Sequence, residues 1–70
     1  MMALQFFSKA IKIDPNDAKT HYLQSRAYAE LGQWDAARTS IEAALKLRPG
    51  QKEFEALAGA IESRGPLPPE

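Results

Sequence analysis

Apolar and polar residues recur along this chain in four blocks, with the three-to-four-residue spacing of amphipathic helices. Residues that stop helices separate the blocks: Pro15, Gly32 and the pair Pro49 and Gly50. This pattern predicts four helices, at about residues 3–13, 17–31, 34–47 and 51–63. We therefore expect an all-α chain.

The first and third blocks repeat each other at a constant offset, 34 residues from Pro15 to Pro49. Seven pairs keep identity or size class: Ala3 with Ala37, Phe7 with Ile41, Ala10 with Ala44, Ile11 with Leu45, Lys12 with Lys46, Ile13 with Leu47 and Pro15 with Pro49. Self-similarity at such a period is typical of stacked helical hairpins, in which each hairpin buries its apolar face against a neighbour.

These residues resemble the tetratricopeptide repeat, a unit of two antiparallel helices about 34 residues long. Residues 18–51 look like one whole unit, on the strength of Tyr28, Gly32, Ala37, Ile41, Ala44, Leu45 and Pro49. Residues 1–17 resemble the second helix of a preceding unit, and residues 52–64 the first helix of a following unit or the solvating helix that ends such arrays. The resemblance implies an α-solenoid of helical hairpins and leaves out only Met1, Met2 and the segment from Gly65.

Four residues depart from the family pattern. His21 and Gln24 stand where the family places an aromatic residue and a leucine, which predicts looser packing of that helix. Glu55 and Glu62 stand at positions that are aromatic in an interior unit, which favours a terminal, water-facing helix. We therefore expect one domain at residues 1–64 and a chain that ends where its fold ends. Residues 65–70 are expected to form a disordered proline-rich tail, in preference to a polyproline ligand built on the PxxP spacing.

Composition limits the possible partners. Nine basic and nine acidic residues balance, so electrostatics favours neither nucleic acid nor an anionic membrane. The chain has no cysteine for a disulfide or thiolate staple, and no apolar run approaches the roughly 20 residues of a membrane span. Its 70 residues form one domain at most, close to the size at which a single core barely suffices. We expect a soluble, cytoplasmic chain.

No set of residues predicts catalysis. Ser8, Ser25, Ser40 and Ser63 lack a histidine at a spacing that suggests a triad. The single histidine, His21, has no cysteine or second histidine beside it for a metal site, and the chain has no glycine-rich phosphate loop. We therefore expect no enzyme, no cofactor and no metal.

A peptide-binding groove is implied by the resemblance, because the first helix of each unit lines the concave side of the stack. Similarity places four residues of the whole unit there: Lys19, Tyr22, Arg26 and Glu30. Two cations beside a tyrosine could hold an acidic peptide or a partner protein by charge-assisted hydrogen bonds. The alternative is a solvated polar face. The carboxylate clamp for chaperone tails is not predicted, because Leu23, Gln24 and Ser25 lack its asparagine.

The first helix suggests a second function, because its hairpin partner is missing and its apolar residues spread over more than half of its circumference. Leu4, Phe6, Phe7 and Ile11 are candidates for a self-association surface that would make a homodimer, and a partly exposed terminal face is the alternative. The function expected first is a protein-interaction module acting as adaptor or scaffold. A structural oligomerisation element and an excised or designed minimal repeat without an evolved ligand, at which Met1 and Met2 hint, remain open.

Overall fold

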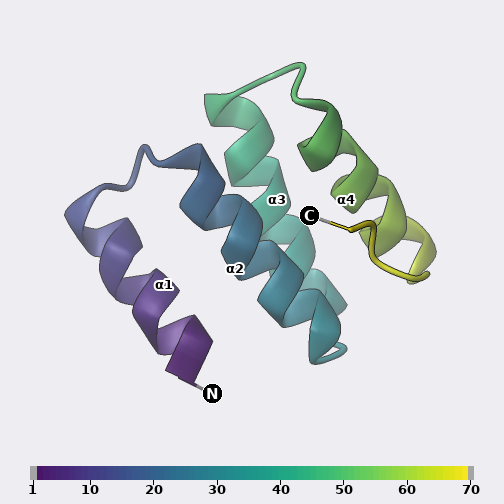
Figure 1. Cartoon of the computed structure of the whole chain (residues 1–70), viewed down its shortest axis with the longest axis horizontal. Coiled ribbons are helices and arrows are strands. Elements are labelled where there is room, and N and C mark those ends of the chain that lie inside the picture. Colours follow the sequence, from purple (N-terminus) through teal and green to yellow (C-terminus); the bar gives the residue numbers. More distant parts are fainter. Residues whose placement is uncertain (1, 70) are drawn as a thin grey trace.

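A computed structural model describes the backbone of residues 2–69 and the side chains of residues 4–69. Within that range the chain forms four helices and no strand: α1 (Met2–Ile13), α2 (Ala18–Glu30), α3 (Trp34–Leu47) and α4 (Lys52–Ser63). The helices run up and down in chain order, and residues after α4 double back toward α2 (Figure 1). The predicted all-α fold of helical hairpins is confirmed. Met1 and Glu70, and the side chain of Ala3 in the repeat comparison, lie outside the described residues.

The helices end at the residues that the sequence pattern marks. Asp17 caps α2: its Oδ1 accepts from the backbone N–H of Thr20 at 3.4 Å and its Oδ2 from the Thr20 hydroxyl at 2.9 Å. Asp17 and Gln51 are therefore caps outside α2 and α4, which begin one residue later than expected. Gly32 (φ 77°) and Gly50 (φ 87°) adopt the left-handed conformation in the next two connections.

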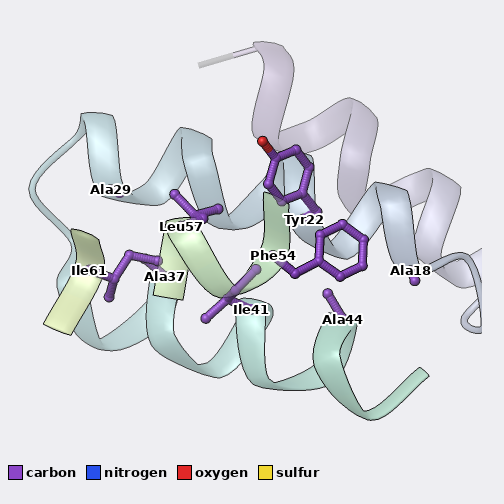
Figure 2. Close-up of a cluster of buried hydrophobic side chains, with 9 residues drawn as sticks. All are labelled: Ala18, Tyr22, Ala29, Ala37, Ile41, Ala44, Phe54, Leu57 and Ile61. Atoms are coloured by element: carbon purple, nitrogen blue, oxygen red, sulfur yellow. The ribbon is translucent and has the colours of Figure 1, made fainter. Parts of the chain in front are cut away.

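The core lies between the hairpin of α2 with α3 and the helix α4 that packs on it. Figure 2 shows Ile41 of α3 and Leu57 and Ile61 of α4 in this cluster, each no more than 2% exposed. Burial of each such side chain stabilises the fold by about 1.5–3 kcal/mol. Six further residues complete what we call the core cluster: Ala18, Tyr22, Ala29, Ala37, Ala44 and Phe54. Ala37 and Ala44 are fully buried, and their small side chains allow the helices to approach closely.

Two hydroxyl groups join α2 to α3. Ser25 is fully buried, and its Oγ donates to the carbonyl oxygen of Ala37 at 2.6 Å. Ser40 Oγ donates to Oε1 of Gln24 at 3.3 Å. These bonds satisfy polar groups inside the hairpin, where an unpaired hydroxyl would cost roughly 1–3 kcal/mol. Gln24 therefore replaces the family's leucine with a polar contact to the partner helix.

Helix α1 packs against α2 and against no other helix of the described range. Its half-buried side chains recur at steps of three and four and so share one face: Leu4, Phe7, Ala10 and Ile11. Phe6 and Ile13 point the other way and are 69% and 86% exposed. The expected self-association set thus divides, with Leu4, Phe7 and Ile11 on the side of α2 and Phe6 on the outer side.

Candidate functional site

The residues expected to line a groove lie along one side of α2, which we call the Arg26 face: Lys19, Tyr22, Arg26 and Glu30. Steps of three and four residues bring them to the same side of the helix. Lys19 and Glu30 are exposed at its two ends, and Arg26 is half-buried at its middle. The structure therefore aligns the four residues, but it gives them different environments.

Tyr22, which the resemblance places in the groove, lies in the core instead. The ring is buried, with only 4% of the residue exposed, and it stacks on Phe54 of α4 with centroids 5.0 Å apart and planes 28° apart. Figure 2 shows Phe54 reaching from α4 to lie against Tyr22. The physical reason is that α4 packs over this part of α2 and removes the aromatic area from water. Tyr22 supports the site from below and is part of the core.

Arg26 is the polar centre of this face. Its guanidinium carbon lies 5.9 Å from the centroid of the Tyr22 ring, within the range of a cation–π contact. Its Nη1 also lies 3.5 Å from the Tyr22 hydroxyl, at the outer limit of a hydrogen bond. A buried aromatic pair thus positions a permanent cation where its donors can meet an approaching acceptor.

An acceptor from elsewhere in the chain already occupies that position. Nη1 of Arg26 donates to the carbonyl oxygen of Pro68 at 2.5 Å, across 42 positions of sequence. Leu67 packs against the core cluster, and Leu67 and Pro68 are both half-buried. The composition of residues 65–70 predicts a disordered end, whereas the described part, residues 65–69, lies back against α2 (Figure 1). We call residues 65–69 the tail.

One feature of the sequence is consistent with this contact, although it does not predict the contact. Leu67 is an aliphatic residue between two prolines, which restrict the backbone and lower the entropy lost when the segment is ordered. The PxxP spacing is visible in the sequence, but the sequence does not indicate which helix the segment contacts. Leu67 and the Pro68 carbonyl are therefore the residues of this site that sequence reasoning missed.

A mixed-charge depression of about 350 Å³ lies beyond the Lys19 end of the Arg26 face. The loops before α2 and before α4 form it, and its charged lining residues are Asp14, Asp17, Lys19, Arg48 and Glu53. Hydrogen bonding to Thr20 is the main cause that holds the pKa of Asp17 below its ordinary value, so this carboxylate stays ionised as a helix cap. The depression therefore has a structural carboxylate in its wall.

Many polar residues of the described range make local contacts. No group of three or more His, Asp or Glu side chains within it could hold a metal ion. Nε2 of His21 lies 2.9 Å from the carbonyl oxygen of Pro15, a local contact that holds the turn before α2. No buried side-chain polar atom in the described part lacks a hydrogen-bond partner. The arrangement is suited to hydrogen bonding and packing.

Comparison with known proteins agrees with this geometry. Residues 3–61 match the family model described as tetratricopeptide repeat. No curated protein and no solved structure matches the chain significantly. None of the described helices is both long enough and apolar enough to span a membrane. The match covers α2, α3 and most of α1 and α4, in the order that the repeat requires. The chain therefore belongs to the tetratricopeptide repeat family, whose members typically mediate protein–protein interaction without catalysis.

Proposed function

We propose that this chain is a protein-interaction module that binds a peptide segment of a partner protein on the Arg26 face. The observation that carries the proposal is the guanidinium of Arg26, placed over Tyr22 and bonded to a main-chain carbonyl oxygen. A guanidinium that donates to one peptide carbonyl oxygen can also donate to another, or to the carboxylate of an acidic residue. Lys19 on the same face adds a second cation that favours acidic segments.

The energetic role of Arg26 sets the expected effect of removing it. A hydrogen bond to a charged group contributes roughly 1.5–3 kcal/mol, so Arg26→Ala should weaken peptide binding at least about tenfold. Because Arg26 also holds the tail, Arg26→Ala and its control are compared in chains whose tail contact is already removed by Leu67→Ser. Helicity should persist, because Arg26 lies at the surface of α2 and alanine favours a helix. Arg38→Ala is the matched control, since Arg38 is an exposed arginine on a different helix, α3.

The experiment begins with peptides selected from a displayed random-sequence library against the full chain and then resynthesised. Titration with these peptides, followed by amide chemical shifts, should perturb α2 and α4 most strongly, and Arg26→Ala should weaken the binding while Arg38→Ala should not. Shift changes concentrated on α1 or on the outer side of α3, with equal affinities for the two variants, would contradict the proposed site.

Self-association is a second candidate, favoured by the outer side of α1. Phe6 and Ile13 are seven positions apart, so they share one side of the helix, and both are exposed. A second copy could cover the two side chains by pairing α1 with α1 in a symmetric homodimer. Phe6 is the residue to test, because it is exposed, whereas Phe7 is half-buried.

The matched variants are Phe6→Glu and Gln5→Glu, which add the same charge to neighbouring exposed positions of α1. If a homodimer forms through Phe6, its mass in light scattering should fall to that of a monomer in Phe6→Glu only. A dimer that survives Phe6→Glu would show that this surface is not the interface. A monomeric parent chain would reject self-association and leave peptide binding as the one proposed function. The cytoplasmic location expected from the sequence stays a prediction.

A further inference from the structure

We infer that the tail is an internal occupant of the Arg26 face, and that it identifies the ligand class of this face as proline-rich extended segments with an aliphatic residue between prolines. The inference rests on the proposed function and deepens it, because it concerns the same site. It predicts that a partner peptide competes with the tail.

The end of α4 turns the chain back toward α2. Arg64 takes the left-handed conformation (φ 52°), its N–H donates to the carbonyl of Ile61 at 3.2 Å, and the N–H of Gly65 donates to that of Ala60 at 3.0 Å. This pair of bonds is the Schellman motif, which ends a helix and reverses the chain. The tail therefore leaves α4 in a defined direction.

Within the described residues, a polar and an apolar contact hold the tail. The carbonyl oxygen of Pro68 accepts from Arg26, and the side chain of Leu67 packs against the core cluster. Pro69, which follows them, is exposed. The tail thus combines a polar contact made by the main chain with an apolar contact made by one side chain, as a docked peptide does.

The chemistry of the tail suits a face whose polar centre is a donor. Pro66, Pro68 and Pro69 have no N–H, so the tail brings several carbonyl acceptors and few donors that need partners. Arg26 supplies donors and no acceptor. A proline-rich segment can therefore lie on this face without leaving its own amide groups unsatisfied, and its restricted backbone lowers the entropy cost of binding.

A tethered segment is an effective competitor. A short flexible connection gives an effective concentration of about millimolar, so even a weakly binding tail occupies the face for much of the time. If the face is open about one-tenth of the time, the apparent affinity for an external peptide falls about tenfold. Loosening the tail should restore that factor.

The test uses full-length variants and a synthetic peptide of the sequence Gly-Pro-Leu-Pro-Pro with blocked ends. Leu67→Ser removes the apolar contact of the tail, and Pro69→Ser is the matched control at an exposed position. The amide shifts of α2 follow binding of the peptide to each variant, and circular dichroism checks their helicity. Pro66→Gly, which loosens the segment while keeping Leu67, is a second opening variant should Leu67→Ser lose helicity.

We expect the peptide to bind Leu67→Ser about tenfold more tightly than the parent chain, and Pro69→Ser to bind like the parent. Equal affinities for the parent and both opening variants would overturn occupation by the tail. If this peptide binds none of the variants while library-selected peptides still bind through Arg26, the inferred ligand class is wrong and the proposed function stands. Failure of both kinds of peptide would reject the proposed function itself.

Discussion

Substitution of Gly32 by alanine tests the turn that makes the hairpin. The N–H of Gly32 donates to the carbonyl of Ala29 at 3.0 Å, and that of Gln33 donates to Tyr28 at 2.9 Å. These bonds again form a Schellman motif, here with glycine in the left-handed position at φ 77°. Alanine costs roughly 1–2 kcal/mol in that conformation, and its smaller unfolded-state entropy offsets part of this cost. We expect Gly32→Ala to lower the free energy of unfolding by about 1 kcal/mol.

Gly59 provides the matched control, because the same substitution should have the opposite sign there. Gly59 lies inside α4, and a Cβ added to it would meet no atom within 4 Å other than its chain neighbours and the nearby backbone of α4 itself. Alanine in a helix interior is favoured over glycine by about 1 kcal/mol, so Gly59→Ala should raise the free energy of unfolding by that amount. The two variants should then differ by about 2 kcal/mol, or roughly 8–16 °C in Tm for a domain of this size.

Urea unfolding followed by circular dichroism measures both variants against the parent chain. A neutral or stabilising Gly32→Ala would show that the turn between α2 and α3 does not need a left-handed residue, and the hairpin geometry would be wrong. A destabilising Gly59→Ala would show that something covers this side of α4, such as a second copy of the chain. Either result would refute the reasoning at an identified position.

Two further substitutions test the core and the helix cap. Leu57→Ala should lower the free energy of unfolding by about 2–5 kcal/mol because Leu57 is fully buried, whereas Leu31→Ala, at a leucine that is 42% exposed, should cost less than about 1 kcal/mol in the same urea experiment. Similar losses would place Leu31 in the core. Folding lowers the pKa of Asp17 from its ordinary value of 3.8. The ionised cap therefore contributes its full stabilisation at pH values above 3.8, and this contribution is lost as the pH falls through the lower pKa of the folded state. Asp17→Asn should therefore flatten the acid side of the stability curve, and an unchanged curve would contradict the Thr20 bonds.

The helices and their ends could be predicted because local chemistry determines them. Pro15 cannot continue a helix, Gly32 adopts a left-handed conformation at low cost, and the offset of 34 residues indicates which helices are equivalent. The cap of α2, Asp17, follows the same local rules. These features depend on neighbours in sequence, which a sequence displays directly.

Features that depend on packing between helices were less accessible. The family resemblance places Tyr22 in a groove, but the packing of Phe54 from α4 decides whether that side of α2 is exposed to water. The hydroxyl of Ser25 donates to the carbonyl of Ala37 inside the hairpin, a contact that depends on α3 and that the position of Ser25 in the sequence does not indicate. The contact between Arg26 and Pro68 joins residues 42 positions apart. It follows from a chain reversal whose left-handed residue is Arg64, where a glycine would be the usual sequence signal.

The claim that the Arg26 face holds an extended segment is tested most directly by nuclear Overhauser effects within the full chain in solution. The account predicts contacts from the Leu67 methyl groups to side chains of the core cluster, and from Pro68 to Arg26. Leu67→Ser should abolish the first set and leave the helices intact. Random-coil shifts throughout residues 65–69, with no contact to α2, would contradict the account.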